Sequence, residues 1–149
     1  MKEIQGNQYL YFEQYKLLVE SAEKVSEKRM GANNYFLTIN TALISLTGLL
    51  SISKILTSNS NFIRLVSGFG LLICIIWFLI VLSYKQLNSG KYKVIHNLER
   101  RLPAKLFTQE WKALGEGKSL RKYIPLSLIE VGVPVVFFLL YLILLFWSF

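Results

Sequence analysis

The chain has 149 residues, of which 53% are hydrophobic, and a formal net charge of +8 at pH 7. Its mean hydropathy of +0.41 argues against an ordinary soluble domain and indicates a membrane protein with a modest soluble part. The one cysteine, Cys74, excludes an intrachain disulfide and is expected to pack within an apolar segment. The amino-terminal residues lack the apolar run of a cleavable signal peptide, so we expect none.

The first element that the sequence predicts is an amphipathic helix over residues 9–30. Its apolar side chains recur at spacings of four and three, whereas the charged ones lie largely on the other side. The apolar positions are Tyr11, Tyr15, Leu18, Ala22 and Val25. Because the polar face mixes acidic and basic residues, we expect this helix to pack onto protein rather than to adsorb to a bilayer surface.

Three membrane-spanning helices are expected, over about residues 35–56, 62–84 and 126–149. After Arg64, the second carries no charge for some twenty residues, about the length that crosses ~30 Å of hydrocarbon. A short polar turn at residues 57–61 should join the first two spans in a hairpin. Pro134 is expected to kink the third span.

Residues 85–125 are expected to form the main soluble segment. The sequence NSG at residues 88–90 indicates a turn, and a helix over residues 91–102 should follow it and stop at a proline. Thr108 is expected to cap a shorter helix that ends near Gly115. The predicted divisions of the chain are therefore residues 1–34, 35–84, 85–125 and 126–149.

Positive residues are distributed unevenly around the expected spans. Of the 17 lysines and arginines, 15 lie before the first span or between the second and the third, and Lys54 and Arg64 flank the hairpin turn. The positive-inside rule therefore places the amino terminus and residues 85–125 in the cytoplasm and the carboxyl terminus outside.

A seam of small and polar residues follows the first expected span. It comprises Asn34, Thr38, Thr41, Ser45 and Gly48, at spacings of four, three, four and three, and Asn40 falls on the same polar side of the helical wheel. In a bilayer such residues belong against another helix or against water. The seam is therefore either an interhelix contact or the wall of a pore.

Two blocks of sequence resemble a known family. They are YKLLVESAEKVSEKRMGANNYFLTINTAL at residues 15–43 and LNSGKYKVIHNLERRLP at residues 87–103, followed by EWKALGEGK and a final apolar helix. Together they resemble the RipA-like small bacterial membrane proteins, which are described as octameric. The layout is also similar to that of the membrane-pore accessory protein of type VI-B CRISPR systems, an octamer associated with antiphage defence. The resemblance implies a homo-octamer, arranged as a ring with a central opening, in a bacterial cytoplasmic membrane.

The sequence offers little catalytic chemistry. It has one histidine, no aspartate, no phosphate-binding glycine loop and no CxxC or HExxH motif, so we expect neither an enzyme nor a bound metal or cofactor. Lys91 and His96 resemble the Arg-then-four-residues-then-His motif of HEPN ribonucleases, with lysine where that family has arginine. Lysine lacks the bidentate fork that grips a phosphate. The alternatives are pairing of His96 with Glu99 or a contact between subunits, which we favour, and pH sensing.

The adjacent Arg100 and Arg101 could contact lipid headgroups, RNA or a cytoplasmic protein. We favour lipid or protein and do not expect nucleic acid as a partner. The sequence thus predicts an all-α integral membrane protein with three spans and cytoplasmic helices, assembled as a homo-oligomeric ring. We expect it to form a pore that alters membrane permeability in phage defence or a stress response. The alternative function is a non-conducting scaffold that recruits a cytoplasmic partner, followed by a HEPN-like ribonuclease.

Overall fold

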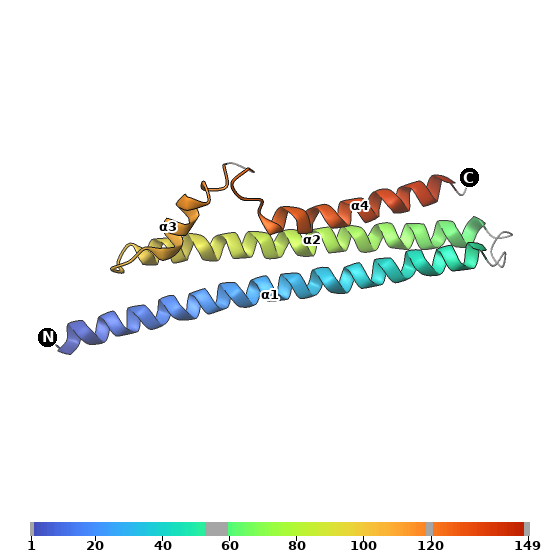
Figure 1. Ribbon diagram of the computed structural model, residues 1–149. Helices are drawn as coiled ribbons and strands as arrows, with labels where there is room; N and C mark the ends of the chain where they lie inside the picture. The colour runs from blue at the N-terminus through green and yellow to red at the C-terminus, as the bar shows by residue number, and fades with distance from the viewer. Residues whose placement is uncertain (1, 53–59, 119–120, 148–149) are drawn as a thin grey trace. The chain divides into compact units, whose positions relative to one another are not determined.

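The computed structural model describes residues 2–52, 60–118 and 121–147, and these residues form helices joined by turns (Figure 1). The helices are α1 (Lys2–Ile52), α2 (Ser60–Glu99), α3 (Leu106–Ala113) and α4 (Leu126–Trp147). The all-helical class predicted from the sequence is confirmed for this part of the chain. The contacts divide the chain into two units, which we call the polar unit (Met1–Lys28 and Tyr84–Pro125) and the apolar unit (Arg29–Ser83 and Leu126–Phe149).

Helix α1 is one uninterrupted helix of 51 residues, whereas the sequence predicted two helices separated near residues 31–34. Gly31 and the two asparagines after it lower helix propensity only modestly, and no proline is present to remove a backbone donor. The Asn33 side chain instead accepts a hydrogen bond of 2.9 Å from the indole of Trp77. The predicted break is wrong because tertiary contacts compensate for weak local propensity.

Helix α2 is also continuous, over 40 residues, where the sequence predicted a span, a turn at residues 88–90 and a separate helix. Asn88 lies inside the helix and is buried, and its amide donates to the Ser26 hydroxyl at 2.9 Å. Gly90 has open space around it and adopts helical backbone geometry. The turn-forming residues at 88–90 are therefore part of a helix, because the Asn88 side chain hydrogen-bonds to Ser26 of α1.

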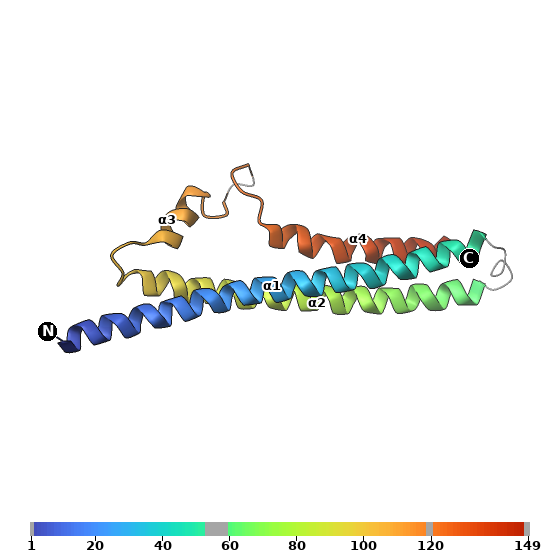
Figure 2. The ribbon, with the colours of Figure 1, turned by 60° about the horizontal axis from the view of Figure 1, so that its bottom comes forward.

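The apolar unit is a three-helix arrangement in which α2 contacts both α1 and α4 (Figures 1 and 2). Trp77 of α2 is fully buried, with its ring centroid 5.9 Å from that of Phe36 on α1 and 5.8 Å from that of Phe137 on α4. Tyr141 of α4 is also fully buried and lies against Gly70, where a Cβ atom would overlap its ring. The glycine therefore permits close approach of α4 to α2.

Two helical segments among the described residues are long and apolar enough to cross a membrane, Asn61–Glu99 and Leu126–Phe146. They contain the second and third expected spans, and Pro134 lies within α4 as predicted. The end of the first expected span, residues 53–56, lies outside the described residues. The structure thus supplies two candidate spans, and a third stays a prediction.

Candidate functional site

In the polar unit, the side chain of Glu99 is the centre of a hydrogen-bond network. It is fully buried at the end of α2, and its carboxylate accepts bonds from the backbone N–H groups of Phe107 and Thr108 at 2.8 and 2.9 Å. It also accepts from the hydroxyls of Thr108 and Tyr15, at 2.7 and 3.1 Å. Both N–H groups belong to the first turn of α3, where backbone donors lack partners within the helix.

Glu99 therefore caps α3, a role that the sequence assigned to Thr108. No side chain caps α3 at Lys105, the residue that precedes it. A carboxylate at a helix amino terminus also interacts favourably with the helix dipole. No local pattern predicts this cap, because Glu99 lies seven positions before the first residue of α3 and reaches it only through the turn at residues 100–105.

The network shifts the acid–base properties of its members. Burial by itself would raise the pKa of Glu99, but the hydrogen bonds from Thr108, Phe107 and Tyr15 outweigh it and lower that pKa below the usual value. Burial and the hydrogen bond to the Glu99 carboxylate raise the pKa of Tyr15 to about 12. Glu99 is thus held as a carboxylate and Tyr15 as a neutral donor over the physiological pH range.

Lys91 and His96 make contacts with different helices. The Lys91 ammonium donates to the Ser21 hydroxyl of α1 at 2.6 Å. The His96 Nδ1 lies 3.2 Å from the Thr108 hydroxyl of α3 and 3.8 Å from the Glu99 carboxylate. Because the Thr108 hydroxyl donates its proton to Glu99, it can only accept from His96, which requires a proton on Nδ1.

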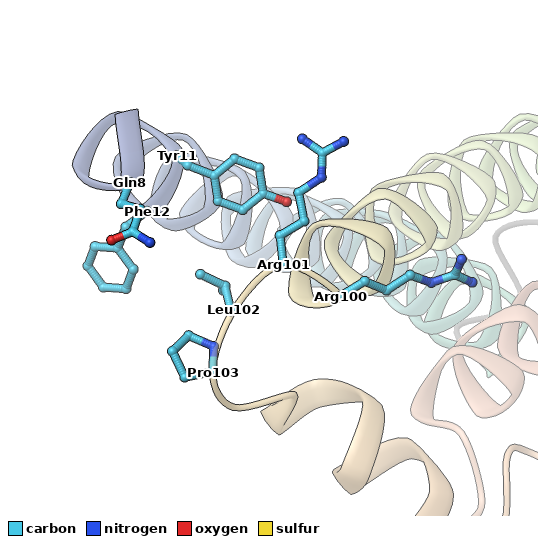
Figure 3. A pocket seen from close by; sticks show the side chains of 7 residues that line it. All are labelled: Gln8, Tyr11, Phe12, Arg100, Arg101, Leu102 and Pro103. Carbon is cyan, nitrogen blue, oxygen red and sulfur yellow. The ribbon is translucent and has the colours of Figure 1, made fainter. Parts of the chain in front are cut away.

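Arg100 and Arg101 border an open cleft of about 730 Å³. Figure 3 shows Gln8, Tyr11 and Phe12 of α1 on one side and residues 100–103 on the other. The Arg101 guanidinium lies over the Tyr11 ring, 5.7 Å from its centroid, and the Tyr11 hydroxyl donates to the Leu98 carbonyl at 2.7 Å. The cleft is therefore cationic, with aromatic and aliphatic walls.

In the apolar unit, the residues of the predicted seam separate into two groups. Asn34, Thr38, Thr41, Ser45 and Gly48 form an exposed stripe on α1, which we call the polar stripe. Asn40 is fully buried and faces the other helices of the unit. Its carboxamide donates to the Phe36 carbonyl at 2.8 Å and accepts from the Cys74 thiol at 3.6 Å, and its own carbonyl accepts from the Tyr141 hydroxyl at 3.5 Å.

The sequence grouped Asn40 with the stripe because it counted polarity over a wide arc of the helical wheel. Asn40 and Thr41 are neighbours and so point about 100° apart on a helix. The packing of α2 and α4 then decides which of the two is covered. Asn40 is an interhelix residue, and the exposed stripe keeps the two alternatives that the sequence left open.

One ion pair of the apolar unit was not predicted. The Arg29 Nε atom lies 2.7 Å from a carboxylate oxygen of Glu130, and the two side chains are 11% and 6% exposed. The pair connects α1 to the first turns of α4. The two residues are about a hundred positions apart in the sequence, and only the packing of the helices brings them together.

No group of three or more metal-ligating side chains occurs among the described residues. The polar unit therefore presents a capping network and a cationic cleft, and the apolar unit presents a polar stripe on otherwise apolar helices. In a helical membrane protein, exposed polar side chains of this kind must contact another copy of the chain or water.

The family of the chain follows from one comparison. Residues 12–149 match the family model described as the octameric membrane protein family (8xMP), so the chain belongs to this family. It is therefore a membrane protein of a family whose name implies octameric self-assembly. Nothing among the curated proteins or the solved structures matches it. The predicted membrane location and self-assembly are confirmed at this level, whereas the topology and the pore stay predictions.

Proposed function

We propose that the chain forms a homo-octameric pore with three spans per copy, and that the pore alters the permeability of a bacterial cytoplasmic membrane. The observation that carries the proposal is the exposed polar stripe on α1 (Asn34, Thr38, Thr41, Ser45 and Gly48). The amino terminus and the polar unit lie in the cytoplasm in this proposal, as the positive-inside rule predicts. Phage defence or a stress response is the setting, in line with the resemblance described above.

The stripe supports a water-filled path for a physical reason. Hydroxyl and amide groups that face hydrocarbon cost free energy unless they find partners. The Thr38 hydroxyl bonds to the Asn34 carbonyl at 2.9 Å, which satisfies one group within the helix. The remaining polar groups of the stripe are covered when eight copies place their stripes around a common axis, where water hydrates them.

Cysteine accessibility tests this proposal. Ser45→Cys in a Cys74→Ser background should react with a charged, membrane-impermeant thiol reagent, and the reaction should reduce leakage from liposomes that contain the octamer. Leu46→Cys is the matched control, because Leu46 is the neighbouring residue, 51% exposed and apolar, about 100° away on the helix. Equal labelling of the two, or labelling of Ser45→Cys without any change in leakage, would overturn the pore assignment.

The second candidate is a scaffold that conducts nothing and recruits a cytoplasmic protein. The cationic cleft favours it, because Arg100 and Arg101 border a space large enough for an acidic side chain or peptide. In that case Arg100→Ala and Arg101→Ala abolish function in cells, whereas polar substitutions in the stripe, such as Ser45→Thr, are tolerated. Tight liposomes with an intact octamer favour this candidate.

We do not propose an enzyme. Lys91 and His96 make hydrogen bonds to α1 and α3 respectively, which supports structural roles for both. A ribonuclease would instead require that the purified protein degrade RNA without metal and that His96→Ala stop the degradation. That result would replace the pore with the third function considered from the sequence.

A further inference from the structure

The outer face of α1 in the polar unit carries acidic residues at a regular spacing. Glu13, Glu20 and Glu27 recur every seven residues. Residues seven apart on a helix lie within about 20° of one another and about 10 Å apart along the axis. This acidic row lies roughly opposite Ala22 and Val25, which are buried against the rest of the unit. The row therefore lies on the side of α1 away from these buried residues, with Glu27 exposed and Glu13 and Glu20 half-buried. Lys16 and Lys24 lie within about 60° of it, so this side of α1 is acidic in net charge although both signs are present.

The corresponding outer face of α2 is basic. Lys93 is exposed and lies roughly opposite the buried Ile95, and the exposed Arg100 follows seven residues later, directly after the helix. Among the described residues, no ion pair includes Lys93, Arg100 or any member of the acidic row. Because α1 and α2 bury their facing sides against each other, the acidic row and Lys93 lie on opposite sides of the helix pair.

Two contacts within the polar unit fix which residues lie at the same level. Ser21 of α1 bonds to Lys91 of α2 at 2.6 Å, and Tyr15 bonds to Glu99 at 3.1 Å. The helices are antiparallel, so a step toward the amino terminus on α1 corresponds to a step toward the carboxyl terminus on α2.

This register places Glu20 level with Lys93 and Glu13 level with Arg100, each within about two residues, or about 3 Å. The two acidic and the two basic residues are thus matched in height as well as in spacing. Within one copy Glu20 and Lys93 lie on opposite faces of the pair, whereas Arg100 follows α2 and borders the cleft with Tyr11 and Phe12 of α1.

Symmetry brings such faces together in an assembly of membrane proteins. Every copy of this chain obeys the same insertion rule and enters the membrane in the same orientation. Equivalent copies are then related by rotation about an axis along the membrane normal, which gives a ring with head-to-tail interfaces. Rotation about that axis does not change the height of any residue along it. Residues that are level on α1 and α2 therefore stay level between neighbouring copies when the helix pair runs parallel to the axis.

We propose that the acidic row of α1 in one copy binds Lys93 and Arg100 of the next copy around the octamer. Glu20 then lies opposite Lys93 of the neighbour, and Glu13 opposite Arg100 of the neighbour. The interface also covers Leu17 and Val94, which are 63% and 49% exposed in the single chain and lie beside the charged rows. The partner of this surface is a second copy of the same chain.

The proposal rests on membership of an octameric family and not on the pore. A ring built in this way can be conducting or non-conducting, so leakage measurements do not test this proposal. Its test is the size of the assembly, measured by native mass spectrometry of the full-length protein extracted in detergent.

Charge reversal at one level provides the first measurement. Glu20→Lys and Lys93→Glu should each lower the octamer fraction by at least about threefold, because each puts like charges opposite one another at all eight interfaces. The double variant Glu20→Lys/Lys93→Glu restores opposite charges and should restore the octamer. The double variant Glu20→Lys/Arg100→Glu changes the same number of charges at mismatched levels and should not.

Mixing the two single variants provides the sharper measurement. Subunits that carry Glu20→Lys and subunits that carry Lys93→Glu can alternate around a ring, and every interface then has opposite charges. The octamer fraction should therefore be higher in the mixture than in either variant alone. An interaction within one chain could not be rescued in this way.

Glu110→Lys is the matched control, since Glu110 is exposed and belongs to α3 rather than to α1 or α2, and the substitution makes the same change in net charge. It should leave the octamer fraction unchanged. The proposal is overturned if this control disrupts the assembly as much as Glu20→Lys does, if the single reversals leave it intact, or if neither the matched double variant nor the mixture recovers octamers. Helix content by circular dichroism shows for each variant that the chain has folded.

Discussion

A buried carboxylate, that of Glu99, lies at the centre of the polar unit, and a buried aromatic ring, that of Trp77, lies at the centre of the apolar unit. Glu99 accepts four hydrogen bonds from α1 and α3, whereas Trp77 contacts aromatic rings on α1 and α4 and makes one hydrogen bond to Asn33. A carboxylate can accept several directional hydrogen bonds at once, and few other side chains can hold a short helix such as α3 in this way. Long apolar helices depend on shape and on close approach instead. The two units should therefore respond differently to the same class of change.

The largest effect is expected from Glu99→Ala, which removes the acceptor of all four bonds. We expect a loss of about 3 kcal/mol in the stability of the polar unit, because buried donors are left without partners. Hydrogen exchange measured by mass spectrometry should show lost protection in α3 and unchanged protection at residues 62–82. Glu110→Ala, at an exposed position of α3, is the control. Equal loss of protection in both variants would show that Glu99 does not hold α3.

The next effect tests shape in the apolar unit. Gly70→Ala places a methyl group where the Tyr141 ring lies, so overpacking should cost about 2 kcal/mol and loosen α4. Gly68→Ala meets no atom within 4 Å in the chain and gains helix propensity, so it should be neutral or stabilising. Exchange of the α4 amides distinguishes the two variants. A destabilised Gly68→Ala variant would mean that a contact between copies, not the Tyr141 ring, governs both positions.

A smaller effect is expected from Trp77→Phe. The substitution keeps an aromatic ring in the core but removes the indole donor to Asn33, and we expect a loss of about 1 kcal/mol. Trp111→Phe, at a side chain that is 41% exposed in the polar unit, should cost less. Thermal denaturation of the two variants in the same detergent compares them. A larger shift for Trp111→Phe would contradict the assignment of Trp77 as the centre of the apolar unit.

The smallest expected effect is one of pH. Because the folded chain lowers the pKa of Glu99, the contribution of this group to stability is present above its ordinary pKa of about 4.5 and is lost as the pH falls through the folded value. Exchange protection in α3, corrected for intrinsic rates, should therefore decrease on acidification below that pH. Glu99→Gln, which cannot titrate, should flatten the dependence. An unchanged dependence in that variant would assign the effect to another group.

Much of the fold was predictable because hydropathy and charge act locally. The all-helical class, the apolar character of residues 62–84 and 126–147 and the end of α3 near Gly115 follow from patterns that neighbouring residues impose on one another. The helix breaks predicted near residues 31–34 and 88–90 were wrong, because Asn33 and Asn88 bond to distant partners within the helices. The five evenly spaced members of the predicted seam are exposed on α1, and helix periodicity alone could not separate the buried Asn40 from them.

The sequence by itself determined that the chain is helical, that it is rich in membrane-compatible segments and that its positive charge is concentrated outside them. Only the tertiary structure decided that Glu99 caps α3, that Arg29 pairs with Glu130 and that Asn40 faces inward while Thr41 is exposed. The physical reason is range. Hydropathy and helix periodicity depend on residues within a few turns, whereas the partner of a buried polar group is set by which helices pack together and at which register.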